Sequence, residues 1–294
     1  MVQTRAQQEK AAERVDDTTT EGQGDGAKAA AGTKRSKPSD NGALEESAGG
    51  EAADEGELAK EQPPAKSAKQ YGDSNEKHPV LSKLLSSFAS FPLHDCGLSK
   101  PTDPTAETIL AHVLHALLTS TRISHQIANT TLKKVIEAGY AQLETLEKST
   151  WGQRTQVLTD GGYTHYREKT STELGELAKL VREKYDGDLN NLLRKAKEQG
   201  DGGGVRKAVR DGIGEVKGIG SVALDIFCDT VQGLWTELAP FVDPRSEETA
   251  REIGIPVEVE ELYKAVGEDA VTMCKITAAL TTVRLEGLLN EFSA

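Results

Sequence analysis

The sequence predicts an all-α fold preceded by a long polar segment. From residue 79 onward, apolar residues recur at intervals of three and four, as on one face of a helix. No segment alternates apolar and polar residues as a half-buried strand would, so no strand is expected. Glycines, N-capping residues and prolines divide the pattern into short helices joined by short connections.

The first 75 residues differ in composition from the rest of the chain. They consist mainly of Ala, Gly, Glu, Asp, Lys, Ser and Thr, with too little apolar surface to offset the entropy of an ordered chain. We expect residues 1–75 to be a disordered acidic tail and residues 76–294 to form the helical domain. Lys34, Arg35 and Lys37 form a basic cluster that reads either as a nuclear-import signal or as a solvated patch. The expectation that the protein is nuclear rests on this cluster.

The predicted helices follow one another closely. Asp103 and Pro104 are expected to begin the first, whose apolar positions fall between residues 109 and 118. The second spans about 123–136, and the next two carry apolar faces at 174–181 and 189–196. The glycine-rich residues 200–204 are expected to form a loop. Further helices are expected at about 205–211, 220–232, 245–253, 258–265 and 267–290.

Composition narrows the classes of function. The formal net charge is −12, and residues 76–294 hold 25 Lys and Arg against 32 Asp and Glu, so any nucleic-acid contact must be local. Cys96, Cys228 and Cys274 are too few and too scattered for a disulfide framework or a four-thiolate metal site. No stretch reaches the roughly 18 apolar residues of a membrane span, so no membrane partner is expected.

The most informative stretch is residues 216–222. Gly218 and Gly220 flank Ile219, which permits a tight turn whose apolar residue packs between two helices. In such a hairpin the first amides of the second helix are free, and together with the helix dipole they attract an anion such as a DNA phosphate. A plain turn between two helices is the alternative. The candidate DNA-binding residues are Lys217, Gly218, Ile219, Gly220, Ser221 and Val222.

This hairpin and the loop behind it, residues 233–243, resemble the helix-hairpin-helix/Gly-Pro-Asp (HhH-GPD) superfamily of base-excision DNA glycosylases, of the endonuclease III type. In that family the hairpin binds the phosphate backbone, and a Gly/Pro-rich loop brings an aspartate into the active site. The similarity includes residues 117–121, which look like the first core helix with its intercalating loop. It also includes residues 161–163, which look like the turn that starts the mid-domain helix. It covers about residues 105–287 and implies two helical lobes with a DNA cleft between them.

The resemblance implies that Asp243 is the catalytic residue. Cleavage of an N-glycosidic bond develops positive charge on the sugar, which an ionised carboxylate stabilises while it can also take a proton from the attacking water. Asp243 before Pro244 is also suited to cap a helix, and both roles can hold together. The target base must leave the stack, which needs a wedge and a pocket. The residues at those places are Thr121, Arg122, Tyr163, His165 and Tyr166.

Two departures from the family limit the expected chemistry. Bifunctional members carry a nucleophilic lysine two residues after the second glycine of the hairpin, where this chain has Val222, so lyase activity is not expected. The cysteine-bounded loop of the family is missing, so no iron–sulfur cluster is expected. We expect no other cofactor or metal, although a monovalent cation at the hairpin is compatible with the resemblance.

We therefore expect a monomeric DNA glycosylase that acts on double-stranded DNA and hydrolyses a damaged or mismatched base with activated water. One alternative is a non-catalytic DNA-binding or repair scaffold, favoured by Val222 and by the acidic balance of residues 76–294. Another is a protein-interaction domain, favoured if the surroundings of the hairpin are acidic.

Three further groups of residues could have either a chemical role or an ordinary structural one. His112 and His115 could ligate a metal from one helix, but no Cys or carboxylate completes the set, so ordinary buried histidines are expected. Residues 94–96, His-Asp-Cys, are expected to form a loop rather than a nucleophilic cluster. The cations of residues 206–210 form either a phosphate-facing patch or a solvated helix face.

The tail gives a first prediction. Deletion of residues 1–75 should leave the melting temperature within a few degrees of the full chain, because this segment has little apolar surface with which to pack. Thermal unfolding of the two chains followed by circular dichroism measures the difference. A larger drop would show that the tail docks on the helical domain.

Overall fold

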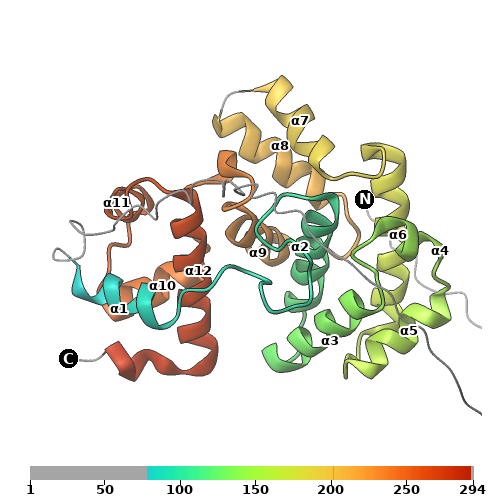
Figure 1. The fold of residues 1–294 in the computed structure, drawn as a ribbon, viewed down its shortest axis with the longest axis horizontal. Coiled ribbons are helices and arrows are strands. Elements are labelled where there is room, and N and C mark those ends of the chain that lie inside the picture. The colour runs from blue at the N-terminus through green and yellow to red at the C-terminus, as the bar shows by residue number, and fades with distance from the viewer. Residues whose placement is uncertain (1–77, 201, 293–294) are drawn as a thin grey trace, which may run out of the picture. The chain divides into compact units, whose positions relative to one another are not determined.

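The computed structural model describes residues 78–200 and 202–292. In this part of the chain all regular structure is helical, with twelve α-helices and two short 3-10 helices (Figure 1). The predicted all-α fold is confirmed. The predicted tail and its basic cluster lie outside the described residues. None of the helices described is long and apolar enough to cross a membrane.

The first lobe is built around α2, a helix buried on almost every side. Ten of its fourteen residues are buried, which is typical of a helix at the centre of a core. It packs directly against α3 and α9 (Figure 1). The helices of this lobe are α2 (Ala106–Thr119), α3 (His125–Glu137), α4 (Leu143–Lys148), α5 (Trp151–Asp160), α6 (Arg167–Tyr185), α7 (Asn190–Gln199), α8 (Gly202–Gly214), α9 (Ser221–Val231) and the 3-10 helix η1 (Thr236–Leu238).

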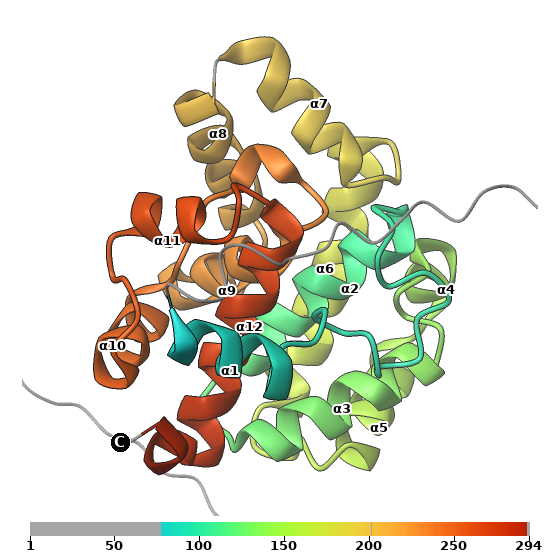
Figure 2. The same cartoon turned by 60° about the vertical axis from the view of Figure 1, so that its left-hand side comes forward.

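The second lobe has a hydrophobic core of its own and combines helices from both ends of the described chain. Its elements are α1 (Pro79–Ser87), α10 (Pro244–Ile253), α11 (Val259–Ala265), α12 (Ala270–Glu286) and the 3-10 helix η2 (Leu288–Phe292). Helix α1 packs on α12, as both views show (Figures 1 and 2). The chain then passes into the first lobe, whose core includes Leu93, Cys96 and Leu98. Contacts between α9 and α12 join the two lobes.

The order of the predicted helices is confirmed, and some boundaries move. The N-cap of α2 is Thr105, whose hydroxyl accepts the Thr108 N–H, so Asp103 does not begin this helix. The glycine-rich stretch was wrongly predicted to be a loop up to residue 204, because α8 begins at Gly202. Residues 161–163 form the turn after α5, and the next helix begins at Arg167.

Three helices were not predicted from the sequence. Helices α1 and α4 have only nine and six residues, too few for a clear periodic pattern. In α5 a buried position is occupied by Arg154, which donates hydrogen bonds to the Ser171 and Ser149 carbonyl oxygens at 2.7 and 2.6 Å. A buried arginine interrupts the apolar period that identifies a helix in a sequence.

Candidate functional site

A glutamine fixes the loop that leads from α9 to α10. Gln232 is fully buried, and its side-chain oxygen accepts the Phe241 N–H at 3.0 Å. Its side-chain nitrogen donates to the Phe241 carbonyl oxygen at 2.9 Å. The amide thus satisfies both backbone groups of Phe241, as a neighbouring strand would. The loop is held two residues before Asp243.

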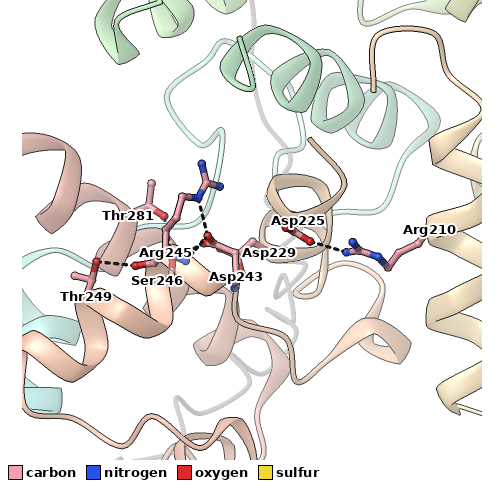
Figure 3. A network of polar contacts seen from close by, with 8 residues as sticks. All are labelled: Arg210, Asp225, Asp229, Asp243, Arg245, Ser246, Thr249 and Thr281. Carbon is pink, nitrogen blue, oxygen red and sulfur yellow. Dashed lines mark hydrogen bonds and ion pairs between the residues drawn. The ribbon is translucent and has the colours of Figure 1, made fainter. Parts of the chain in front are cut away.

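Two arginines of α8 hold the same loop from the other side. Arg206 donates to the Pro240 carbonyl oxygen at 2.9 Å, and the Arg210 guanidinium lies 5.8 Å from the centre of the Phe241 ring. Arg210 also forms an ion pair with Asp225 at 2.9 Å (Figure 3). Arg206 and Arg210 therefore position the loop. The sequence, which offered a phosphate-facing patch or a solvated face for residues 206–210, did not predict this role.

Asp243 is the N-cap of α10 and is almost completely buried. Its Oδ1 accepts hydrogen bonds from the N–H and Nε of Arg245 at 3.0 and 2.9 Å, and its Oδ2 accepts one from Ser246 Oγ at 2.6 Å (Figure 3). Burial alone would raise the pKa of Asp243, but hydrogen bonds from Ser246, Arg245 and Asp229 outweigh burial and lower it. The capping role predicted from Pro244 is present, and the carboxylate is ionised at neutral pH.

A second carboxyl group, Asp229 of α9, lies against Asp243. Its Oδ1 accepts the Asp243 N–H at 3.2 Å, and the residue is only 5% exposed. The pKa of Asp229 is raised well above its ordinary value by burial first and by the charge of Asp243 second. The two groups thus carry one negative charge, which lies on Asp243. Sequence reasoning missed Asp229, although an acidic residue inside the apolar run 226–231 was a signal for it.

A pocket of about 360 Å³ opens beside this carboxyl pair. Its walls come from the connection between α1 and α2, from α2, α3 and α9 of the first lobe, and from α10 and α12 of the second. We call it the interlobe pocket. The polar side chains that line it include Ser90, His94, Asp95, His115, Thr119, His125, Asn129, Lys133, Asp229, Thr230, Asp243, Arg245, Thr281, Thr282, Arg284 and Glu286.

The two histidines of α2 are neutral at physiological pH. Burial, with a smaller contribution from a neighbouring histidine, lowers the pKa of His112 to about 3 and that of His115 to about 4. His112 Nδ1 lies 3.0 Å from Thr230 Oγ1, so it is held in the core, whereas His115 lines the pocket. Among the residues that the structure describes, no group of three His, Cys, Asp or Glu side chains could hold a metal ion.

Residues 94–96 form a loop, as predicted, and this loop reaches the interlobe pocket. Asp95 is held by Lys133 of α3 at 3.0 Å. Burial raises the pKa of the Cys96 thiol to about 11, so it is not a thiolate at neutral pH. The three side chains therefore shape the pocket wall without forming a nucleophilic group.

The hairpin between α8 and α9 has the predicted geometry. Gly218 adopts φ +91°, and a Cβ there would lie 2.6 Å from Glu173 Cδ and 2.8 Å from Leu117 Cδ1. Ile219 packs against the core of the first lobe. Gly220 precedes α9 and provides no side-chain cap for its first amides. The binding of DNA phosphate by these amides, and of a monovalent cation at the hairpin, stays a prediction.

The side chains around the hairpin are acidic as well as basic. Lys217 forms an ion pair with Glu176 at 3.0 Å, and the buried carboxyl group of Glu173 lies against Gly218. Ser221 is exposed, and Val222 is 42% exposed. An exposed valine at this position supplies no amine for covalent chemistry.

The five predicted wedge and pocket residues lie in different environments. Tyr163 is fully buried, and its hydroxyl lies 2.8 Å from Thr121 Oγ1, so these two support the connection between α2 and α3. His165 is exposed and packs edge-on against Tyr166. Arg122 is exposed in that connection, and the neighbouring residues Thr119 and Ile123 line the interlobe pocket. The assignment of wedge and pocket roles stays a prediction.

The two hairpin glycines should respond differently to substitution. Gly218→Ala should destabilise the protein by about 1–3 kcal/mol, because alanine disfavours positive φ and its Cβ meets Glu173 and Leu117. Gly220→Ala should leave stability nearly unchanged, since its φ is −108° and a Cβ at this position would meet no atom within 4 Å. Urea unfolding compares the two variants. Equal stability would contradict the close approach at Gly218.

The raised pKa of Asp229 predicts a pH-dependent stability. A carboxyl group that binds its proton more tightly in the folded state stabilises the fold fully at low pH. That contribution is lost as pH rises above about 4, the unfolded pKa, towards the folded pKa. Asp229→Asn keeps the Oδ1 acceptor and cannot ionise, so its stability relative to the wild type should rise by up to about 1.4 kcal/mol per pH unit in that window.

Urea unfolding of Asp229→Asn and the wild type at several pH values between 4 and 8 measures this difference. Asp103→Asn, at an exposed carboxylate, is the matched control and should show a small difference that is independent of pH. A flat difference for Asp229→Asn as well would contradict the assignment of a shared proton to the Asp229 and Asp243 pair.

Comparisons with known proteins give a similarity of fold. No family model matches the sequence, and no curated protein matches it either. Among solved structures, the chain is similar to H. pylori 3-methyladenine DNA glycosylase (MagIII) bound to 1,N6-ethenoadenine, with 16% sequence identity and a TM-score of 0.44. The match covers 73% of this chain and 98% of that one. The similarity concerns the fold alone.

Proposed function

We propose that this chain is a DNA N-glycosylase that releases a damaged or mismatched base from double-stranded DNA by hydrolysis. The observation that carries the proposal is the position of Asp243, an ionised carboxylate on the wall of the interlobe pocket. It stands at the end of a braced loop that follows the helix-hairpin-helix segment. An anionic group in a pocket open to a ligand suits a reaction that develops positive charge.

The surroundings of Asp243 favour electrostatic stabilisation of the sugar. Three hydrogen bonds from Arg245 and Ser246 fix the orientation of the carboxylate before any substrate binds. Because Asp229 holds a proton, the pair presents one negative charge at a defined position. A preorganised charge in a site of low dielectric stabilises a cationic transition state without reorganisation of solvent. Asp243 would also accept a proton from the attacking water.

The pocket would receive the base once it leaves the duplex. The connection between α2 and α3 lies at its edge, since Thr119 and Ile123 on either side of Arg122 line the pocket. Arg122 is therefore the residue best placed to fill the gap in the DNA stack. The hairpin, with Lys217 and the free amides after Gly220, would bind the phosphate backbone without regard to sequence.

Hydrolysis is favoured over lyase chemistry because the residues described around Asp243 offer no free amine. Val222 replaces the family lysine, and Lys133 is the one lysine among the described residues that line the interlobe pocket. The hydrogen bond from Lys133 to Asp95 raises the pKa of its ammonium group, which keeps the nitrogen protonated. A protonated lysine cannot attack the sugar.

A second candidate function, a protein-interaction or repair-scaffold domain, is favoured by the acidic side chains at the hairpin. Glu176 neutralises Lys217 in an ion pair, and Glu173 lies beneath Gly218. The Glu176 ion pair reduces the positive charge with which the hairpin would attract phosphate, whereas Glu173 is itself paired with Lys169 at 3.4 Å. DNA binding that is undetectable even at low salt, where electrostatic attraction is strongest, would favour the protein-interaction role.

Asp243→Asn separates an enzyme from a scaffold. Asparagine keeps an acceptor for the Arg245 N–H and loses the charge, so base release should fall by at least about 100-fold while the stability loss stays near 1 kcal/mol. Asp269→Asn is the matched control, because Asp269 is likewise an N-cap in the second lobe and lies outside the pocket lining. Labelled duplexes with uracil, alkylated, oxidised and mismatched bases serve as substrates.

The same assay tests the chemical route. Base release should leave abasic sites that alkali converts to strand breaks, and borohydride should trap no covalent adduct. Full activity of Asp243→Asn would exclude Asp243 as the catalytic group. Robust trapping that Lys133→Ala abolishes would show a lyase route through Lys133. If the protein binds DNA but releases no base from any substrate, it acts as a scaffold, and the role of Asp243 is limited to capping α10.

A further inference from the structure

We propose that Arg245 and Arg284 form a phosphate-binding site in the interlobe pocket, which takes a backbone phosphate beside the target nucleotide. The two arginines come from different helices, since Arg245 lies in the first turn of α10 and Arg284 in the last turn of α12. Both line the pocket together with Asp243. The DNA assignment of this site rests on the proposed glycosylase function, whereas its affinity for phosphate does not.

Arg245 uses only part of its hydrogen-bonding capacity within the protein. Its Nε donates to Asp243 Oδ1 at 2.9 Å, and 40% of its side chain is exposed. Figure 3 shows that the end of its guanidinium group projects beyond this contact, away from Asp243. The guanidinium nitrogens at that end are therefore free to bind an anion that enters the pocket.

Arg284 has a buried donor that the protein leaves without an acceptor. Its Nε is shielded from solvent and has no hydrogen-bond partner in the described part of the chain. The nearby carboxylate of Asp243 is already bound by Arg245 and Ser246. Buried N–H groups of native proteins almost always have a partner, so an unpaired arginine donor in a pocket indicates a ligand that supplies one.

The electrostatics around Arg284 support an anion as this ligand. Burial, followed by the charge of Arg245, lowers the pKa of Arg284, while the negative charge of the Asp243 and Asp229 pair acts in the opposite direction. An arginine remains protonated in proteins, so two guanidinium charges line the pocket together with the ionised carboxylate of Asp243. The dipole of α12 favours a cation at its last turn but offers no acceptor to the buried Nε.

A phosphate fits this pair better than a carboxylate does. The guanidinium group is planar and binds two oxygens at once, and phosphate presents oxygens to both arginines. A backbone phosphate held here would bring the adjacent sugar towards Asp243, which is where the proposed reaction needs it.

Salt dependence of DNA binding tests the site. Arg284→Gln should reduce the slope of log affinity against log salt by about 0.9 and weaken binding roughly five- to tenfold at 0.1 M salt, as loss of one phosphate contact does. Arg251→Gln, at an exposed arginine of α10 outside the pocket lining, should leave the slope unchanged. Glu286→Gln, which removes an acidic group from the pocket edge, should strengthen binding. Fluorescence anisotropy with a duplex that contains an abasic-site analogue gives these slopes.

Inorganic phosphate tests the same site without DNA. At constant ionic strength, phosphate should raise the melting temperature of the wild type and of Arg251→Gln more than that of Arg284→Gln. Arg284→Lys keeps the charge and loses the planar fork. It should therefore keep the salt slope and lose affinity, which provides a second variant if Arg284→Gln does not fold.

The outcomes separate this inference from the proposed function. A phosphate effect that disappears in Arg284→Gln, in a protein that releases no base, supports the anion site while the glycosylase proposal fails. Base release that depends on Asp243, with unchanged slope and phosphate response in Arg284→Gln, overturns the anion site alone. A lost phosphate effect with an unchanged DNA slope means that the site takes free phosphate, which overturns its assignment to the DNA backbone.

Discussion

A carboxylate buried between two helical lobes has to be stabilised by its neighbours, and much of the site follows from this constraint on Asp243. Its charge is fixed by Arg245 and Ser246 of α10, and its backbone N–H is bound by Asp229 of α9. One aspartate therefore links a helix of the second lobe to a helix of the first. Burial first, and the charge of Asp243 second, raise the pKa of Asp229, so it keeps its proton and the charge remains on Asp243.

The contacts that hold the preceding loop also help to keep Asp243 in place. Gln232 satisfies both backbone groups of Phe241, and Arg206 binds the carbonyl oxygen of Pro240. These contacts fix the loop up to two residues before Asp243, and the donors to its carboxylate, Arg245 and Ser246, come from α10. A fixed carboxylate is useful to a reaction only when it is placed before the substrate arrives, which is what these contacts achieve.

The sequence was sufficient to predict features that depend on a few neighbouring residues. The apolar spacing of α2, the glycines of the hairpin and the Asp243-Pro244 pair each act over a few residues, so the helices, the hairpin geometry and the cap were predicted from them. The interlobe pocket was not predictable in this way. Asp229, Arg284 and the loop of residues 94–96 meet there from distant parts of the chain, and each has an ordinary appearance in the sequence. Helix α5 was missed because Arg154 occupies a buried position where the pattern requires an apolar residue.

In the proposed function, the hairpin and the pocket would contribute unequally to the attraction of DNA. At the hairpin Glu176 pairs with Lys217, so what remains for phosphate there is mainly the uncapped end of α9. Arg245 and Arg284 line the pocket with the ionised Asp243, and among the described residues a buried donor of Arg284 has no acceptor. In a chain whose net charge is −12, attraction for DNA has to come from a few such places. Because both arginines line the pocket with Asp243, the phosphate contact that we propose would also bring the adjacent sugar towards the carboxylate.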